Sequence, residues 1–508
     1  MAKQKAPDTL AGLQVSKTNS APLYAQIYTS LRDRILQGKL PPGMRLPAAR
    51  TLSQSLGVSR NTITAAFLQL VSEGYCEQRR GNGAYVSSFL PDALMKPAGN
   101  ETKPANRTTP IAIEAAARKA NAAAEQISLR SKRYIAAQGA AQETEMQGVF
   151  KTGTPALDLF PMDIWQKCLK SIPTYKTLGY QDAAGYLPLR KAIAAYLGAS
   201  RDVYCSAESI IIVNGAQQAL HILSLLLMDE GTPVWMEEPG YQLAAQLFRA
   251  NGARIIPAPV SQHGFETEIA LKLDSSAKIA YVTPSHQYPT GAVMPIAQRM
   301  ALLQWAQQTG GWILEDDYDS EFRYTGHPLP ALQGIDTNGR VIYIGTFSKS
   351  MFPALRIGYI VAPPSLAPTC AHIKNLLDRS TTIGAQAALA KFIDDGYFMQ
   401  HIRRMRILYA QRQAALKSAL DTWLADLLNI RDVSPAGLHM MVELKAPAPL
   451  GYDTYVSRKA LRKGVIVPAL SYYYTGEEKQ QGFVLGFGNG TPQELEAGVK
   501  TLQKLLRA

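Results

Sequence analysis

A lysine flanked by two serines is the first group in this sequence that could do covalent chemistry. Lys349 lies in "GTFSKSMFPALRIGY", between Ser348 and Ser350, directly after the apolar run 341–347, which is typical of a β-strand. Arg356 follows seven residues later. A lysine amine can form a Schiff base with an aldehyde cofactor, and an arginine can pair bidentately with a phosphate. Pyridoxal 5′-phosphate carries both groups, so the pattern predicts this cofactor.

Two further stretches could bind the phosphate of that cofactor. Thr346 and Ser348 place hydroxyl donors close to the lysine. In "VNGAQQAL", an apolar run turns through Gly215 into a helix, and the first amides of that helix, at Ala216 and Gln217, would point at an anion. The sequence therefore predicts two anion-binding elements for one phosphate.

An acidic stretch and an aromatic side chain are suited to hold the pyridine ring. "ILEDDYDSEF" presents Asp316, whose carboxylate would keep the ring nitrogen protonated, and Tyr318, whose phenol would bond the ring 3′ oxygen. Asp317 is an alternative for the carboxylate, and the sequence leaves this choice open. Tyr241, after "EEPG", is expected to stack on the ring face.

The segments that must position these residues alternate between two kinds. From about residue 150 onwards, apolar runs such as "SIIIVNG", "KIAYVTP" and "VIYIGTF" alternate with helical segments such as "AQQALHILSLLLMDEG". This alternation is typical of an α/β domain with a mainly parallel sheet covered by helices. We expect this domain to span residues 148–508.

These motifs resemble those of fold-type I aminotransferases over roughly residues 150–505. The resemblance rests on "YQDAAGYLPLRKAIAAYL", "NGAQQAL", "EEPGY", "TPSHQYPTG", "EDDYDSEF" and "SKSMFPALRIGY". It implies the fold of that family, with the cofactor bound at Lys349.

Two positions depart from the pattern of working aminotransferases. Tyr288 stands before the Pro-Thr-Gly turn, where those enzymes usually have an asparagine that bonds the ring 3′ oxygen. Val484 stands where an arginine usually clamps the substrate carboxylate, and the sequence has no arginine between residues 462 and 507. The departures argue against efficient turnover of common α-amino acids. They favour a different ligand, or a different clamp at Arg323 or Arg431.

The first 87 residues follow another plan. "LYAQIYTSLRDRIL" has helical spacing, Gly57 stops a second short helix, and Ser59 caps a third helix that ends at Gly74. "YCEQRRGNGAYVS" then alternates around a Gly-Asn-Gly turn, as a β-hairpin does. The pattern predicts an α+β winged helix-turn-helix domain over residues 18–87.

The third helix begins with side chains that can read bases. Arg60 can bond guanine bidentately and Asn61 can bond adenine, with Ser59 and Thr62 beside them. Four more arginines are expected to contact phosphates, bases or the adjacent minor groove: Arg45, Arg50, Arg79 and Arg80. The predicted partner is double-stranded DNA.

This head resembles the DNA-binding domain of the GntR family over nearly all of residues 22–86, and the whole chain resembles the MocR subfamily of that family. The resemblance implies a regulator whose aminotransferase-like domain binds the cofactor and senses a metabolite. It also implies a homodimer, commonly domain-swapped head to tail, in which Tyr180, from "LGYQD", reaches the partner's cofactor phosphate.

Composition agrees with a basic, DNA-facing head on a soluble protein. The formal net charge is +13, and residues 1–86 carry 11 Lys and Arg against 4 Asp and Glu. Residues 88–147, rich in Ala, Pro, Asn and Thr, are expected to form a partly helical linker. The N-terminus has no apolar segment, and the four cysteines have neither paired nor metal-ligand spacing. We expect a cytoplasmic location, no membrane partner and no metal.

Three functions from different classes compete. The first is a transcription regulator that senses an amine or amino-acid-like metabolite through aldimine exchange at Lys349. The second is a true aminotransferase with an accessory DNA-binding domain, which multiple-turnover keto-acid production would identify. The third is a regulator that uses the domain only as a dimerisation scaffold with an empty site. Four residues weigh against the third: Lys349, Asp316, Tyr318 and Arg356. A scaffold has no need of all of them, so the first is favoured.

Overall fold

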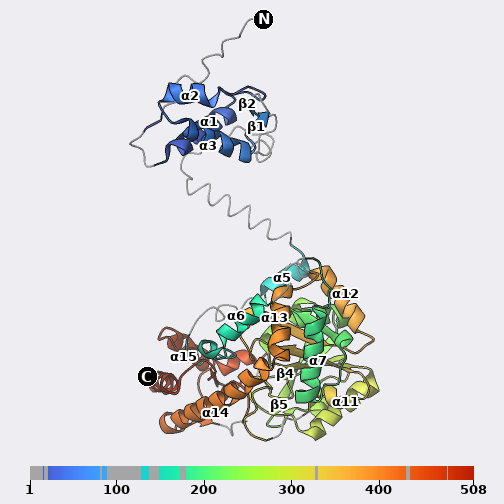
Figure 1. The fold of residues 1–508 in the computed structure, drawn as a ribbon. Helices are drawn as coiled ribbons and strands as arrows, with labels where there is room; N and C mark the ends of the chain where they lie inside the picture. The colour runs from blue at the N-terminus through green and yellow to red at the C-terminus, as the bar shows by residue number, and fades with distance from the viewer. Residues whose placement is uncertain are drawn as a thin grey trace. The chain divides into compact units, whose positions relative to one another are not determined.

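The computed structural model divides the chain into two compact units, Met1–Asn121 and Ala122–Ala508 (Figure 1). The structure describes residues 15–16, 21–79, 83–87, 127–136, 148–171, 179–326, 330–430, 435–476 and 479–508. Each unit is a separate body.

The first unit is a three-helix core with a β-hairpin, as the sequence predicts. Its elements are α1 (Leu23–Leu36), α2 (Ala49–Leu56), α3 (Arg60–Ser72), β1 (Cys76–Arg79) and β2 (Gly83–Val86). Strands β1 and β2 are antiparallel. Apolar residues at helical spacing, among them Ile27, Leu31, Ile63 and Leu70, are fully buried between the helices. The opposite side of α3 is left to solvent.

Local signals in the sequence explain where α2 and α3 end and begin. Gly57 adopts a left-handed conformation, with φ of 62°, which only glycine enters without steric cost. Two residues later the Ser59 hydroxyl accepts a hydrogen bond from the Thr62 amide, at 3.1 Å, and caps α3. The turn between the helices is therefore set by the chain itself.

The second unit is built on an eight-stranded, mostly parallel sheet. The strand order is β3-β10-β9-β8-β7-β4-β5-β6. Strand β10 is antiparallel to both of its neighbours, and the edge strand β6 is antiparallel to β5. The bounds are β3 (Ile210–Val213), β4 (Pro233–Glu238), β5 (Arg254–Ser261), β6 (Gly264–Phe265), β7 (Ile279–Val282), β8 (Trp312–Asp317), β9 (Val341–Thr346) and β10 (Gly358–Val361). The mainly parallel sheet predicted from the sequence is confirmed.

Helices cover both faces of this sheet (Figure 1). The helices of this unit are α5 (Leu129–Ala136), α6 (Met162–Lys170), α7 (Leu187–Arg201), α8 (Ala216–Leu227), α9 (Gln242–Ala250), α10 (Thr267–Leu273), α11 (Ile296–Thr309), α12 (Ala367–Leu377), α13 (Ile383–Asp394), α14 (Tyr397–Trp423), α15 (Tyr452–Leu461) and α16 (Pro492–Leu506). In β3, Ile212 packs in the cluster that includes α7 and α13, whereas Ile211 packs in the cluster that includes α8, α9 and α12. Burial on both faces explains why these strands are continuously apolar.

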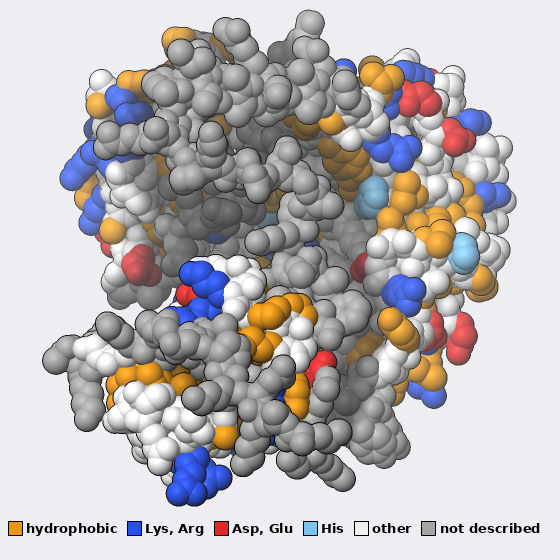
Figure 2. All heavy atoms as spheres, turned by 90° about the horizontal axis from the view of Figure 1, so that it is seen from above, with side chains coloured by type: hydrophobic (Ala, Val, Ile, Leu, Met, Phe, Trp, Pro, Cys, Tyr) orange, Lys and Arg blue, Asp and Glu red, His pale blue; other side chains and the backbone are white. Residues whose placement is uncertain are grey.

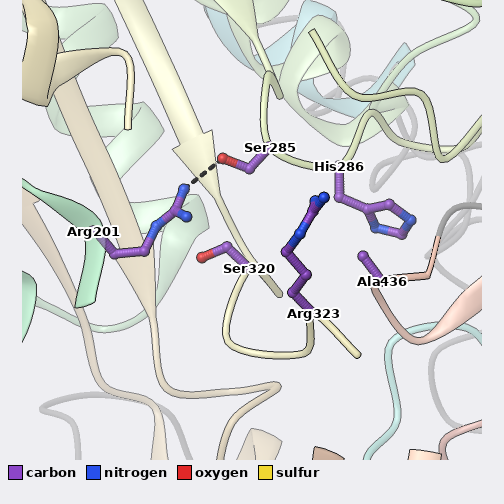
Figure 3. A pocket seen from close by; sticks show the side chains of 6 residues that line it. All are labelled: Arg201, Ser285, His286, Ser320, Arg323 and Ala436. Atoms are coloured by element: carbon purple, nitrogen blue, oxygen red, sulfur yellow. Dashed lines mark hydrogen bonds between the residues drawn. The ribbon is translucent and has the colours of Figure 1, made fainter. Parts of the chain in front are cut away.

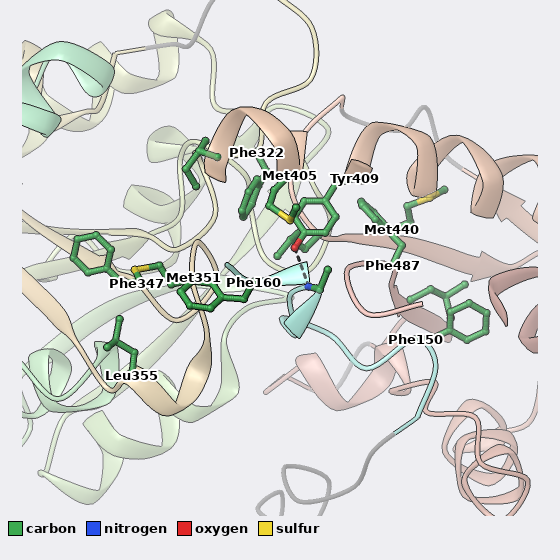
Figure 4. Packing of buried hydrophobic residues seen from close by; sticks show 14 of the residues in the cluster. Phe150, Phe160, Phe322, Phe347, Met351, Leu355, Met405, Tyr409, Met440 and Phe487 are labelled. Carbon is green, nitrogen blue, oxygen red and sulfur yellow. Dashed lines mark hydrogen bonds between the residues drawn. The ribbon is translucent and has the colours of Figure 1, made fainter. Parts of the chain in front are cut away.

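A smaller antiparallel sheet lies near the C-terminus. It consists of β11 (Leu428–Ile430), β12 (His439–Leu444) and β13 (Gly482–Gly486), in that order. One large apolar cluster joins it to the main sheet and includes Phe150, Phe347 and Phe487 (Figure 4). Within it the Tyr409 hydroxyl accepts a hydrogen bond from the Ala156 amide, at 2.9 Å. The segment around residues 148–160 is thereby fixed against α14.

The surface carries mixed side chains. Where Figure 2 colours them, basic, acidic and apolar side chains are interspersed. Among the helices that the structure describes, none combines the length and the apolar character needed to cross a bilayer.

Candidate cofactor site and DNA-binding surface

Lys349 lies just beyond the end of β9, and a hydrogen bond from its amine fixes the position of the side chain. Its Nζ donates a hydrogen bond to the carbonyl oxygen of Gly153, at 2.9 Å. Burial lowers the pKa of Lys349, and the nearby carboxylates of Asp319 and Asp316 oppose this shift. An amine with a lowered pKa is neutral more often, and the neutral amine is the nucleophile that a Schiff base requires.

The two predicted anion-binding elements lie together. Arg356 Nη2 donates to the carbonyl of Asn214, at 2.7 Å. A Cβ added to Gly215 would lie 3.3 Å from the same nitrogen, so only glycine leaves the guanidinium and the start of α8 this close without adjustment. The amides of Ala216 and Gln217 open α8, where backbone N–H groups have no partner within the helix. This is a cradle suited to a phosphate.

The neighbouring hydroxyls and the predicted stacking residue join this cradle. The Ser348 amide donates to the Thr346 hydroxyl, at 3.2 Å, and the two hydroxyls lie 3.1 Å apart. Gln217 Nε2 donates to the Tyr241 hydroxyl, at 2.9 Å, and so links α8 to the start of α9. Tyr241 is half-buried there.

The structure distinguishes Asp316 from Asp317. Asp317 is occupied, because it lies 2.9 Å from the Arg201 guanidinium and accepts a hydrogen bond from the Tyr343 hydroxyl at 2.7 Å. Asp316 accepts from the Tyr281 hydroxyl at 2.7 Å through one oxygen, while its other oxygen, Oδ1, is buried with no hydrogen-bond partner among the described residues. Burial raises the pKa of Asp316 to about 6. An unpartnered buried carboxylate oxygen fits the protonated nitrogen of a pyridine ring.

Tyr318 belongs to a network that sequence reasoning missed. Its hydroxyl donates to the His286 carbonyl, at 2.9 Å, and lies 3.2 Å from His286 Nδ1. The same ring nitrogen lies 3.2 Å from both carboxylate oxygens of Asp319. His439 packs beside His286 with ring centroids 4.9 Å apart and the rings tilted by 49°. The motif "TPSHQYPTG" holds His286, but nothing in its spacing pointed to this partner set.

Three of these side chains also form a metal-ligand type of cluster, although the sequence predicted no metal. Donor atoms of His286, Asp319 and His439, all buried, lie within 4.8 Å of one another. Such a separation is wider than the donors of one tetrahedral zinc, which bind at about 2 Å from the ion. Hydrogen bonds account for these positions, because Asp319 and Tyr318 contact His286 Nδ1, and His439 Nε2 lies 3.1 Å from the Pro289 carbonyl.

The two positions that depart from aminotransferases lie close together. The Tyr288 hydroxyl lies 3.0 Å from that of Tyr473 and donates to Thr152 Oγ1 at 3.4 Å. Val484 is fully buried in a small apolar cluster with Met441, and Tyr288 packs against that cluster. The position of the usual arginine clamp is therefore apolar and aromatic.

Arg323, one of the alternative clamps, lines a small cavity (Figure 3). The cavity measures about 10 Å³ and is also lined by Arg201 and His286. That volume is about one water molecule. Arg431 lies outside the described residues.

Tyr180 is 86% exposed, and the Arg379 guanidinium lies 4.9 Å from its ring centroid. The contact of Tyr180 with a partner's cofactor phosphate stays a prediction.

The predicted DNA-reading side chains gather on the solvent side of the first unit. Arg60 and Asn61 are exposed at the start of α3, and Thr62 is half-buried beside the capping Ser59. Arg45 is exposed, and its backbone bridges to Tyr85 in the hairpin. The remaining predicted residues are Arg50, exposed in α2, Arg79, whose backbone ends β1, and Arg80, which lies outside the described residues.

Fold and site together define a DNA-binding winged helix joined to a fold-type I aminotransferase domain. Family models agree: bacterial regulatory proteins of the gntR family match residues 23–86, and aminotransferase class I and II matches residues 157–502. The chain is 38% identical to a probable rhizopine catabolism regulatory protein, MocR, of Rhizobium meliloti, over 98% of this chain and 96% of that protein. It is 32% identical to the pyridoxine biosynthesis transcriptional regulator PdxR of Corynebacterium glutamicum, over 91% of each. The chain therefore belongs to the MocR group of GntR-type regulators, and DNA is its partner.

Solved structures resemble the second unit. The kynurenine aminotransferase of Pyrococcus horikoshii superposes with a TM-score of 0.67 at 27% identity, over 76% of this chain and 96% of that one. LysN, the α-aminoadipate aminotransferase of Thermus thermophilus, gives 0.68 at 26% identity, over 76% and 98%. Both structures contain forms of the same cofactor, PMP in the first and N-(5′-phosphopyridoxyl)-L-leucine in the second. Pyridoxal phosphate is the cofactor of this domain, and the residues described above fit it.

Proposed function

We propose that this protein is a transcription regulator that senses an amine or amino-acid-like metabolite through aldimine exchange at Lys349. The observation that carries the proposal is the convergence of three groups on one site: the Lys349 amine, the unpartnered oxygen of Asp316 and the cradle at Arg356 and Gly215. The same chain carries a winged helix for DNA.

Bound pyridoxal phosphate supplies an aldehyde carbon that can be held by one amine at a time. An arriving effector amine would form a bond from its nitrogen to this carbon, and the bond from the carbon to Lys349 Nζ would break. The two hydrogens of the effector amine pass to Lys349, which leaves as a free amine, so no oxidant or reductant is required. The freed Lys349 amine would be able to donate to the Gly153 carbonyl, the contact that it makes in this structure at 2.9 Å.

The other residues hold and polarise the cofactor. Asp316 keeps a proton on the ring nitrogen, and its bond from Tyr281 fixes its orientation. Tyr318 would bond the ring 3′ oxygen by turning its hydroxyl from the His286 carbonyl, and Tyr241 would cover a ring face. Arg356 and the start of α8 hold the phosphate with two or more charge-assisted hydrogen bonds.

A helix of the predicted linker, α5, supports a route for the signal. Arg133 pairs bidentately with Glu230, at 2.7 and 2.8 Å, and Asn251 donates to the Tyr134 hydroxyl at 3.0 Å. These contacts attach α5 beside the ends of α8 and α9, the two helices that begin at Gly215 and Tyr241. An amine exchange at the cofactor that moved α8 or α9 would also move the attachment of α5. The two arrangements of α5 would then differ in free energy, and coupling between the cofactor site and the DNA-binding unit requires such a difference.

Borohydride reduction of the purified protein, followed by peptide mapping, tests the proposal. We expect a pyridoxyl label on Lys349 and loss of the yellow colour in Lys349→Ala. A control substitution at the exposed Lys417, which pairs with Asp421, should leave the label in place. A label on another lysine, or none at all, would contradict the assignment.

A true aminotransferase with an accessory DNA-binding domain is the second candidate, because the domain resembles active enzymes. The regulator is favoured because relatives over nearly the whole chain are named as transcription regulators. We further propose a cytoplasmic homodimer, domain-swapped head to tail, in which Tyr180 reaches the partner's cofactor phosphate. Keto-acid formation over many turnovers would favour the enzyme instead.

A further inference from the structure

Strand β13 separates two environments by simple alternation. Phe483 and Leu485 point into the large apolar cluster, whereas Val484, between them, belongs to the small cluster with Met441, Leu470 and Tyr473. Val484 pairs with Met441 across β12 and β13 and is fully buried. The side chain at this register position therefore faces the Tyr288 side of the sheet.

The small cluster reaches the cofactor site through Tyr288. The Tyr288 ring packs edge-on against Tyr318 and Tyr241, with centroids 5.8 and 6.1 Å away. Its hydroxyl donates to Thr152, the residue before Gly153, whose carbonyl holds Lys349. An effector joined at the position of Lys349 Nζ would thus have this apolar and phenolic wall beside it.

A carboxylate beside the reacting carbon would gain little from that wall. The Tyr288 and Tyr473 hydroxyls are already 3.0 Å from each other, and Val484 and Met441 offer no donor. A carboxylate taken from water without a charged partner loses solvation that neutral contacts do not replace.

Two arginines near the site do not supply the missing charged partner for a carboxylate. Arg356 is directed to the Asn214 carbonyl and the phosphate cradle, and the cavity beside Arg323 holds about 10 Å³. Lys151 also lowers the Lys349 pKa, with an effect smaller than those of the carboxylates Asp319 and Asp316.

We infer that the effector is a primary amine that carries no carboxylate on its amino carbon, and that Val484 is a residue that determines this specificity. The inference rests on the proposed function, since it describes the ligand of the same site. The apolar side chains of Val484 and Met441 lie buried beside the Tyr288 and Tyr473 rings, so this side of the site presents no charge to the amine.

Matched ligand pairs test the inference through the cofactor absorbance of the intact protein. The probes are 2-phenylethylamine with L-phenylalanine, and 3-methylbutylamine with L-leucine, because each pair differs only by the carboxylate. We expect each amine to shift the absorbance at a concentration at least about tenfold lower than its amino acid. Equal or stronger responses to both amino acids overturn the inference.

Substitution at Val484 gives the second measurement. Val484→Arg should lower the half-saturating concentration of both amino acids by about tenfold or more and leave the amines nearly unchanged, whereas Val484→Leu keeps the wild-type order. If Val484→Arg does not retain the cofactor, the wild-type pairs alone decide. A wild-type response to amino acids that is lost in Lys151→Met would assign the carboxylate to Lys151 and overturn the inference.

The outcomes also separate this inference from the proposed function. If neither amines nor amino acids shift the absorbance of protein with bound cofactor, the sensing role itself fails. If amino acids respond as readily as amines, sensing stands and only the specificity assigned to Val484 is wrong.

Discussion

The DNA-reading surface and the cofactor site differ in how their residues are held. Arg60 and Asn61 are exposed on α3, and their position depends on one helix and its cap. Lys349 and Asp316 are held by residues from distant parts of the chain, such as Gly153 and Tyr281. In the first region, binding and folding are nearly separate properties. In the second, most substitutions change both.

The largest expected effect lies at a buried ion pair beside the cofactor site. Burial disfavours the Arg201 cation, but the Asp317 carboxylate, together with Tyr343, Glu315 and Tyr196, more than offsets this and raises the Arg201 pKa. Asp317→Asn should lower the free energy of unfolding by about 3–5 kcal/mol, because it leaves a buried charge unpaired. Asp421→Asn, in the exposed pair with Lys417, is the control and should cost less than about 0.5 kcal/mol. Urea unfolding measures both, and equal losses would contradict the contrast.

Asp316 should behave oppositely, because its charge is needed for the cofactor and not for the fold. The folded pKa of about 6 lies above the ordinary value of 3.8, so this group contributes most to stability below about pH 4 and its contribution is lost as pH rises through 6. In cofactor-free protein, Asp316→Asn should therefore be more stable than wild type at pH 7.5 by up to about 3 kcal/mol, and nearly equal near pH 4.

The same substitution should weaken the binding of the cofactor. At pH 7.5 we expect Asp316→Asn to raise the dissociation constant of pyridoxal phosphate at least about tenfold, measured by equilibrium dialysis. If Asp316→Asn is less stable than wild type without cofactor, or binds the cofactor normally, Asp316 does not pair with the ring nitrogen. Asp317 would then be assigned that role.

On the exposed side, Arg60→Ala should affect DNA and leave the fold intact. We expect a loss of about 1–3 kcal/mol at the cognate operator with relaxed base preference, because a bidentate base contact is removed. Arg50→Ala should weaken binding more uniformly across sequences and reduce its salt dependence. Fluorescence anisotropy with a panel of operators distinguishes the two effects. If both variants bind DNA as the wild type does, the assignment of the DNA-reading surface to these residues is wrong.

The smallest effect is expected at the cap of α3. Ser59→Ala removes the hydroxyl that accepts from the Thr62 amide and should destabilise the start of α3 by about 1 kcal/mol, whereas Ser59→Gly should cost only a few tenths. Hydrogen exchange of α3 amides in the intact protein reports this difference. An unchanged exchange rate in Ser59→Ala would mean that tertiary packing alone holds the helix.

The sequence predicts features that depend on local patterns better than features that depend on contacts between distant residues. The cap at Ser59, the stop at Gly57 and the continuously apolar strand β3 are local patterns, and each was predicted correctly. The choice between Asp316 and Asp317 could not be made, because adjacent strand residues point to opposite faces and only distant partners such as Arg201 distinguish them.

The environment of Tyr318 was missed for the same reason. His286 and Asp319 lie 33 residues apart in sequence, and neither carries a spacing that announces a contact. Lys349 and Gly153 are separated by 196 residues. Motif order predicts which residues reach a site, while hydrogen-bond partners depend on how the sheets and helices pack.

The most direct test of the account is operator binding measured with and without an amine that shifts the cofactor absorbance. The protein carrying cofactor is compared with Lys349→Ala, by anisotropy and by footprinting. The account predicts that the amine changes operator affinity about 5- to 150-fold, or alters the footprint, in the wild type and not in Lys349→Ala. If the amine shifts the absorbance while operator affinity, footprint and transcription stay unchanged, cofactor-based sensing is contradicted.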